Sequence, residues 1–228
     1  SLAALHAVGT PSVCEAAALT ASRGRLLASK TIRDKVTVAV AFPRSDRALR
    51  RYDVGTVMAV GIGSGRRDTL TGEAVTALQK ADVIVGYDRY CEQIRALFPE
   101  KRYLFSGMRQ EVERCRAAIE EASQGREVAV ISSGDAGVYG MAGLLAELLH
   151  AYDHEGVHLE VVPGVTAALT AAAALGAPLM NDFAAVSLSD LLSEKQTILK
   201  RLEASASVGM PCALYNARSR KRRELFDT

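Results

Sequence analysis

The sequence predicts an α/β protein in which a mostly parallel sheet is flanked by helices. From residue 56 onward, short apolar runs alternate with longer stretches whose apolar residues have helical spacing. Segments rich in glycine and other small residues follow several of these apolar runs. Strands that alternate with helices form parallel sheets covered by the helices. With 49% hydrophobic and 24% charged residues, the 228-residue chain can bury one substantial core or two modest ones.

We expect the first 45 residues to be only part of a domain. Residues 11–24 predict a short helix, and residues 35–42 alternate valine with small residues as a strand does. One helix and one or two strands are too few for an independent core. The charged stretch that begins after Pro43 predicts a linker over residues 46–55.

The elements after this linker follow from their patterns in chain order. Continuous apolar runs bounded by polar or small residues predict strands over residues 56–63, 82–87, 102–106, 127–133, 157–164, 183–189 and 211–216. Apolar residues at helical spacing predict helices over residues 71–81, 90–98, 111–125, 140–152, 165–176 and 190–205. In the last helix, the apolar positions predicted to pack in the core are Leu192, Ile198, Leu199 and Leu202.

The first predicted strand of this region is followed by a glycine-rich loop, "VGIGSGRRDTLT". Its glycines allow either a sharp turn or close approach of the backbone to a ligand, and Thr71 can cap the next helix. Arg66 stands where a dinucleotide fingerprint requires its third glycine, and the Gly-Lys-Ser/Thr sequence of a P-loop is absent. The loop therefore predicts a turn and leaves open whether it binds a ligand.

Two further loops rich in small residues follow predicted strands. In "SSGDAGVYG", Asp135 can accept hydrogen bonds from a ligand or cap the next helix. In "VVPGVTAALTA", Thr166 has the same two options. Because ligands bind at the carboxyl ends of strands in open α/β sheets, we expect the three loops to form one site.

Together the three loops, with "DFAAVSLSDLL" and "ALYNARSRKR", resemble the tetrapyrrole methyltransferases that use S-adenosylmethionine, and within them the precorrin-3B C17-methyltransferase family. The resemblance covers residues 56–223. Departures from the family pattern are Ser64, Ala136 and Ala217 in place of prolines, and Asn181 in place of histidine. Residues 1–45 resemble the C-terminal end of the cobalt-precorrin-5A hydrolase family, which favours a fused pathway polypeptide.

The resemblance implies an S-adenosylmethionine-dependent C-methylation of a precorrin at C17, with ring contraction, in cobalamin biosynthesis. The cofactor-binding residues would be Gly63, Ser64, Ser133, Gly134, Asp135, Val138, Tyr139, Thr166, Ala167, Leu214, Tyr215 and Asn216. Candidates for proton transfer are Asp135, Asp182 and Asp190, and those for binding substrate carboxylates are Arg66, Arg67, Arg218 and Arg220. We expect no metal, and we expect Asp135→Ala to weaken S-adenosylhomocysteine binding while leaving the fold intact.

The resemblance also implies domain boundaries. Residues 56–216 would be the N-terminal α/β domain of the enzyme and residues 217–228 a basic interdomain linker, with the second domain largely absent from the chain. We expect a homodimer.

Composition excludes little else. The net charge of +2 gives no case for nucleic acid, although the basic run after residue 217 could be a solvated surface or meet an acidic ligand. Without an apolar stretch of about 18 residues or a signal peptide, the sequence predicts a cytoplasmic protein that does not enter the membrane. The four cysteines include no CxxC pair, which favours buried or idle thiols in a reducing compartment.

A noncatalytic fragment serving assembly and a nucleotide-binding oxidoreductase domain remain as alternative functions.

Overall fold

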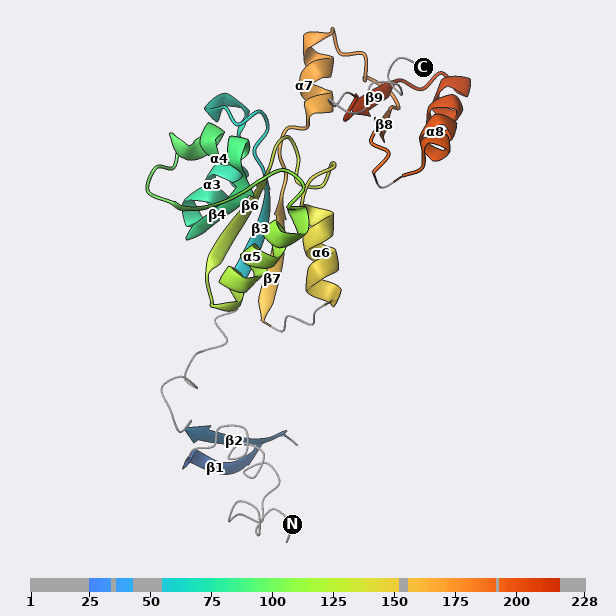
Figure 1. Ribbon diagram of the computed structural model, residues 1–228. Coiled ribbons are helices and arrows are strands. Elements are labelled where there is room, and N and C mark those ends of the chain that lie inside the picture. Colours follow the sequence, from blue (N-terminus) through green and yellow to red (C-terminus); the bar gives the residue numbers. More distant parts are fainter. Residues whose placement is uncertain (1–24, 34–35, 43–54, 152–155, 192, 218–228) are drawn as a thin grey trace. The chain divides into compact units, whose positions relative to one another are not determined.

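The computed structural model describes residues 25–33, 36–42, 55–151, 156–191 and 193–217. The chain divides into two compact units, Ser1–Val54 and Gly55–Thr228. In the first unit, β1 (Arg25–Arg33) pairs antiparallel with β2 (Val36–Phe42), as Figure 1 shows. The strand predicted over residues 35–42 is confirmed, whereas the helix predicted over residues 11–24 lies outside the described residues.

In the described part of the second unit, five strands form one parallel sheet in the order β5-β4-β6-β3-β7 (Figure 1). The strands are β3 (Gly55–Gly61), β4 (Val83–Tyr87), β5 (Arg102–Ser106), β6 (Glu127–Ser132) and β7 (Val157–Val162). Gly55, which the sequence placed at the end of the linker, is the first residue of β3. The prediction of a mostly parallel sheet is confirmed.

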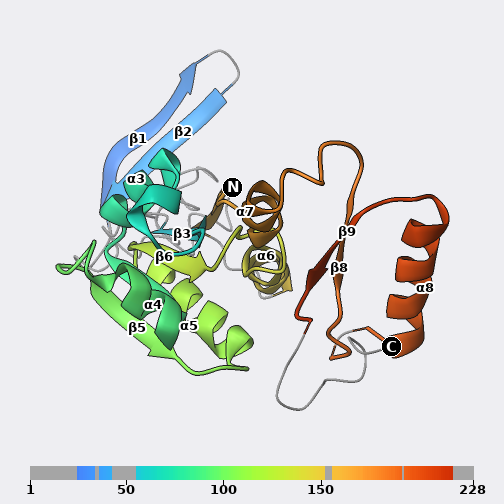
Figure 2. The same cartoon turned by 90° about the horizontal axis from the view of Figure 1, so that it is seen from above.

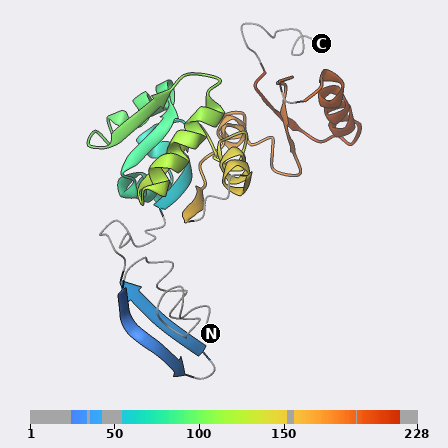
Figure 3. The ribbon, with the colours of Figure 1, turned by 60° about the horizontal axis from the view of Figure 1, so that its bottom comes forward.

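Helices cover both faces of this sheet, which explains why its central strands are apolar throughout. The helices are α3 (Gly72–Lys80), α4 (Asp88–Arg95), α5 (Glu111–Ser123) and α6 (Ala142–Ala151). In β3, Met58 and Val60 join the core that α3 and α4 cover, whereas Val57 and Ala59 join the core under α5 and α6. Figure 3 shows α5 and α6 side by side on their face.

Two of the cysteines are buried, one on each face of the sheet. Cys91 belongs to the core under α3 and α4, and Cys115 to the core under α5 and α6. Burial raises the pKa of Cys91 to about 12 and that of Cys115 to about 11. Both thiols therefore stay protonated and weakly nucleophilic at neutral pH, as expected for packing residues.

The predicted strands over residues 183–189 and 211–216 form, but they do not join the large sheet. They are β8 (Ala184–Ser187) and β9 (Cys212–Tyr215), which pair with each other in a separate two-stranded parallel sheet (Figure 2). The crossover between them is α8 (Lys195–Ser207), whose fully buried Ile198 packs on Val186 and Leu188. This helix begins five residues later than the predicted start at residue 190, and Leu192 lies outside the described residues.

Between the two sheets runs α7 (Ala167–Ala174), a short alanine-rich helix. It confirms the middle of the helix predicted over residues 165–176. Only Ala168 and Ala172 are buried on it, and Leu169 is half exposed. The helix thus leads from β7 of the large sheet toward β8 of the small one.

Candidate functional site

Three loops meet at the carboxyl edge of the large sheet, after the neighbouring strands β6, β3 and β7. Gly63 and Gly134 exchange two backbone hydrogen bonds, of 3.0 and 2.7 Å, and so join the first loop to the second. At Gly164, an added Cβ would lie 2.1 Å from the carbonyl oxygen of Gly134 and 2.6 Å from the carbonyl carbon of Gly61. Because such contacts are too short for any side chain, glycine at position 164 lets the third loop pack directly on the other two.

Asp135 links the second loop to the third. Its Oδ1 accepts a hydrogen bond of 2.8 Å from the backbone N–H of Gly137, and its Oδ2 accepts one of 2.9 Å from the N–H of Gly164. The helix that follows begins only at Ala142, so these two bonds, rather than a helix cap, are what the carboxylate provides here. Each carboxylate oxygen has a second lone pair that can accept a hydrogen bond from a ligand.

The first loop is shaped by hydroxyl groups. Ser64 Oγ and Thr69 Oγ1 share a hydrogen bond of 2.8 Å, and the N–H of Ser64 donates to the same Thr69 oxygen at 3.2 Å. Thr71 caps α3 by accepting from the N–H of Ala74 at 3.0 Å, as predicted, and its hydroxyl donates to the Pro163 carbonyl at 3.2 Å. The cap therefore also ties the first loop to the third.

The second loop alternates exposed and buried residues. Ser133 is exposed, with its Oγ 3.5 Å from the Gly63 carbonyl oxygen, and Val138 is half-buried. Gly134 has φ +72°, and a Cβ there would meet no described atom closer than 3.6 Å. At Gly134 the conformation, and not lack of space, requires glycine. Gly134 itself is buried, with its N–H and C=O both bonded to Gly63, so the exposed residues of this loop are Ser133, Gly137 and Tyr139.

A pair of tyrosines joins the large sheet to the small one. The ring centroids of Tyr139 and Tyr215 lie 4.9 Å apart. The Tyr215 hydroxyl shares a hydrogen bond with the Thr166 hydroxyl and accepts another from the N–H of Ala168 at 3.2 Å. The Tyr139 hydroxyl donates to the Ala185 carbonyl at 3.0 Å. Four of the predicted cofactor residues, Tyr139, Thr166, Ala167 and Tyr215, are thereby brought together at the start of α7.

Two more of the predicted cofactor-binding residues lie in β9 or directly after it. Leu214 is 43% exposed, and Asn216 donates through Nδ2 to Ser187 Oγ at 3.0 Å. Asn216 and Tyr139 both have a φ of +53°, a conformation that non-glycine residues adopt only when their surroundings hold them. The tyrosine pair and the Asn216 hydrogen bond provide such surroundings here.

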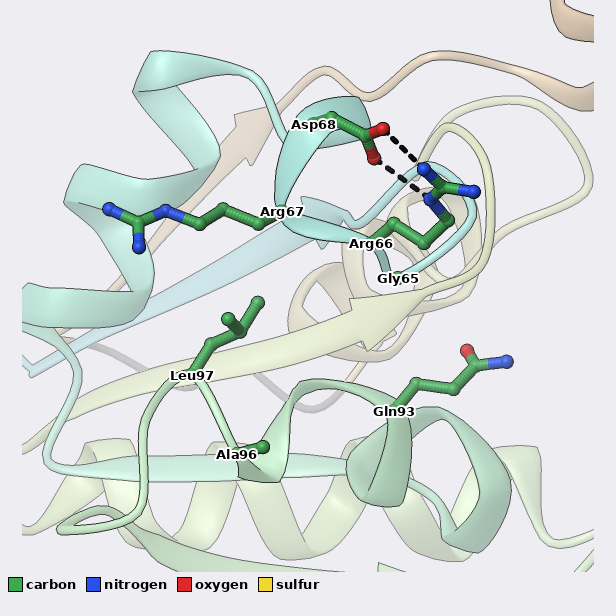
Figure 4. A pocket seen from close by; sticks show the side chains of 7 residues that line it. All are labelled: Gly65, Arg66, Arg67, Asp68, Gln93, Ala96 and Leu97. Carbon is green, nitrogen blue, oxygen red and sulfur yellow. Dashed lines mark hydrogen bonds and ion pairs between the residues drawn. The ribbon is translucent and has the colours of Figure 1, made fainter.

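A pocket of about 400 Å³ lies beside the first loop (Figure 4). It is lined by Gly65, Arg66, Arg67, Asp68, Gln93, Ala96 and Leu97. Arg66 and Asp68 form two hydrogen bonds, of 3.0 and 2.6 Å, which raise the pKa of Arg66 and lower that of Asp68. Arg67 points to the opposite side from Arg66 in Figure 4. Asp68 thus offsets the charge of Arg66, and Arg67 is the better placed of the two to meet an anion.

The remaining predicted residues lie apart from the three loops in the chain. Asp182 is exposed in the segment before β8, and Asp190 is exposed after that strand. Arg218 and Arg220 lie outside the described residues. Of the three aspartates proposed for proton transfer, Asp135 is the one within the loop cluster.

Sequence reasoning missed two contributors to this cluster. Thr69 fixes the conformation of Ser64, and Gly164 supplies both the close packing and the N–H that Asp135 holds. The glycine after "VVP" was a usable signal, since glycine in a strand pattern often marks close approach of another backbone. No such signal marks Thr69, whose role depends on the path of the folded loop.

This geometry defines an open α/β domain with a candidate ligand site at the carboxyl ends of its strands, where adjacent loops lead to helices on opposite faces. The chain belongs to the tetrapyrrole (corrin/porphyrin) methylase family, whose model matches residues 56–226. Residues 1–41 match a second family, described as the C-terminus of cobalamin synthesis G. Both resemblances that the motifs indicated are confirmed.

Similar proteins within this family carry more specific names. The chain is 47% identical over 163 residues to a probable cobalt-factor III C(17)-methyltransferase of Salmonella typhimurium, covering 72% of this chain and 67% of that protein. It is 38% identical over 170 residues to the precorrin-3B C(17)-methyltransferase of a Sinorhizobium species, covering 74% and 66%. A crystal structure of the methyltransferase CobJ is 42% identical, with a TM-score of 0.70 and coverage of 75% and 72%.

The matched region is only part of many such relatives. It covers 32% of a cobalt-factor III methyltransferase of Priestia megaterium and 47% of a probable C(17)-methyltransferase of Methanothermobacter thermautotrophicus. Within the residues that the structure describes, no helix combines the length and the apolar character that crossing a membrane requires.

Proposed function

We propose that this chain carries the S-adenosylmethionine-binding α/β part of an enzyme that methylates a precorrin-type tetrapyrrole at C17, with ring contraction, in cobalamin biosynthesis. The observation that carries the proposal is the meeting of three glycine loops, cross-linked through Asp135, in a chain whose relatives are named as C17-methyltransferases. The boundaries 56–216 for this domain and 217–228 for a linker belong to the same proposal.

The residues present fit an adenosyl ligand. The exposed Ser64 and Ser133 offer hydroxyls, and Tyr139 and Leu214, 52% and 43% exposed, offer apolar surface. When bound, S-adenosylmethionine would supply the methyl group from its sulfonium. The protein would contribute position and exclusion of water, which are the main requirements of a transfer between two bound reactants.

The tetrapyrrole would carry several carboxylates. Arg67, which faces away from the Arg66–Asp68 pair, is the first candidate to bind one of them, and Arg218 and Arg220 are further candidates. Asp135 is the preferred group for proton transfer because it lies within the loop cluster. A homodimer, a cytoplasmic location and a fused pathway polypeptide remain predictions from the sequence.

The test is a calorimetric titration of the 228-residue chain with S-adenosylhomocysteine, with NAD as the control for general nucleotide affinity. Binding of S-adenosylhomocysteine and not of NAD is expected. Absence of binding to both would contradict the proposal for this chain and favour a noncatalytic role in assembly. Binding of NAD alone would favour an oxidoreductase and overturn the proposal.

A further inference from the structure

The turn between β5 and α5, residues 107–110, lies at the same edge of the sheet as the three loops, because β5 is parallel to the other strands. It presents two large side chains to solvent. Met108 is 70% exposed, and Arg109, also exposed, has no ion pair with any carboxylate in the described part of the chain. An unpaired cation beside an apolar side chain suits a ligand that is itself apolar with anionic groups at its periphery.

The turn is held from within by hydrogen bonds. Gln110 Oε1 accepts from the N–H of Gly107 at 2.8 Å. Arg114, only 6% exposed, donates from Nη2 to the Gly107 carbonyl at 3.0 Å and from Nε to Ser106 Oγ at 2.6 Å. Its remaining described partner is Met141 Sδ at 3.7 Å, directly after the second loop. Arg114 thus fixes the turn relative to that loop.

The guanidinium of Arg114 also lies in an unusual environment for a positive charge. It lies in the first turn of α5, where the helix dipole disfavours a cation, and its hydrogen-bond partners in the described structure are all neutral. A buried cation whose hydrogen-bond partners are all neutral is costly, so Arg114 is committed to holding the turn. Glu111 and Glu113 lie in the same first turn of α5 and counter its charge, which leaves Arg109 as the exposed cation of the turn 107–110.

The backbone of Arg109 is strained. Its φ is +67°, in the left-handed region where glycine is favoured and a longer side chain is not. A turn selected only for its shape would be more stable with glycine at this position. Strained non-glycine residues cluster at functional sites, so the conformation of Arg109 supports a use for its side chain.

We propose that the turn 107–110 is a further contact surface for the tetrapyrrole, in which Arg109 binds a peripheral carboxylate and Met108 packs against the ring. This inference rests on the proposed function for the identity of the ligand. The charge on Arg109 meets the carboxylate at the protein surface, so the pair contributes modestly and is weakened by salt.

The test uses uroporphyrin I, a fluorescent tetrapyrrole with eight carboxylates, as the probe. Fluorescence anisotropy at low ionic strength would compare the wild-type chain with Arg109→Gly, which removes the guanidinium and relieves the backbone strain. A matched control is Arg201→Gln, which removes one exposed charge from α8. We expect Arg109→Gly to bind uroporphyrin about fivefold more weakly, the energy of an exposed ion pair, with unchanged S-adenosylhomocysteine affinity and an equal or higher melting temperature.

The outcomes separate this inference from the proposed function. Equal uroporphyrin affinity of wild type and Arg109→Gly, an equal loss in Arg201→Gln, or no uroporphyrin binding by the wild type would each overturn the assignment of Arg109. If the wild-type chain fails to bind S-adenosylhomocysteine while Arg109→Gly still weakens uroporphyrin binding, the proposed cofactor fails and the carboxylate surface stands.

Discussion

At the scale of single residues, Asp135 cross-links the second and third loops of the candidate site. The sequence presents it as a ligand contact whose removal spares the fold, whereas in the structure both carboxylate oxygens accept backbone hydrogen bonds, from Gly137 and Gly164. Its removal would leave two N–H groups without their partner. The same residue therefore shapes the site and remains a candidate to bind the ligand.

We expect Asp135→Asn to lower both stability and S-adenosylhomocysteine affinity. An amide has one accepting oxygen, so its NH2 group would face the N–H of either Gly137 or Gly164. Loss of one hydrogen bond to a charged group should lower the free energy of unfolding by about 2 kcal/mol. Urea denaturation and calorimetry would measure the two effects, with the exposed Asp182→Asn as control. Wild-type values for both quantities in Asp135→Asn would show that the cross-link is unimportant.

Individual site residues were predictable where their role depends on neighbouring residues in the chain. Glycine after a strand, a threonine before a helix and an aspartate in a small-residue loop can be recognised from neighbours in the chain, and Thr71 and Gly134 behave accordingly. The pairing of Arg66 with Asp68 and the contact between Tyr139 and Tyr215 depend on rotamers or on segments far apart in sequence. Such contacts have no periodic signal, so sequence analysis did not find them.

At the scale of elements, Glu121 joins α5 to two basic residues. It makes two hydrogen bonds of 2.9 Å with Arg102 of β5 and an ion pair with Arg126 just before β6. The hydrogen bonds from Arg102 chiefly, with those from Arg126, hold the pKa of Glu121 below its usual value, against the opposing effect of burial. The ionised carboxylate therefore fastens the helix to the edge of the sheet.

We expect the stability that Glu121 contributes to be lost in acid. Because its folded pKa is lowered, the contribution is complete above the usual glutamate pKa of about 4.3 and disappears as the pH falls through the folded value. Since both arginines are partly exposed, Glu121→Gln should cost about 1 kcal/mol at pH 7. Urea denaturation at pH 7 and near pH 3 would test this; a difference between wild type and variant that is equal at both pH values would contradict it.

It was easier to predict which segments form strands than to predict which strands pair with each other. The central strands β3, β4 and β6 are nearly buried throughout and carry continuous apolar sequence, whereas the edge strands β5 and β7 are partly exposed and carry mixed sequence. The apolar runs at β8 and β9 also gave strands, but these form their own sheet around α8. Which strands pair depends on long-range packing that an apolar run alone does not specify.

At the scale of the whole molecule, the second unit contains its own buried clusters. Their members, buried and partly buried, run from Val57 to Ala217 and fill both faces of the large sheet and one face of the small one. The three loops and the turn 107–110 belong to the same unit, Gly55–Thr228. The fold and the candidate site thus depend on residues of one compact unit.

We therefore expect a chain shortened to Gly55–Thr228 to fold and to bind S-adenosylhomocysteine as the 228-residue chain does. Because Gly55–Thr228 is a compact unit by itself, removal of Ser1–Val54 should change its free energy of unfolding by no more than about 0.5 kcal/mol, the range within which the effects of distant, independent sites add. Urea denaturation followed by circular dichroism, and calorimetry with S-adenosylhomocysteine, would compare the two chains. A shortened chain that unfolds at markedly lower urea, or binds more weakly, would show that Ser1–Val54 supports the methylase unit directly.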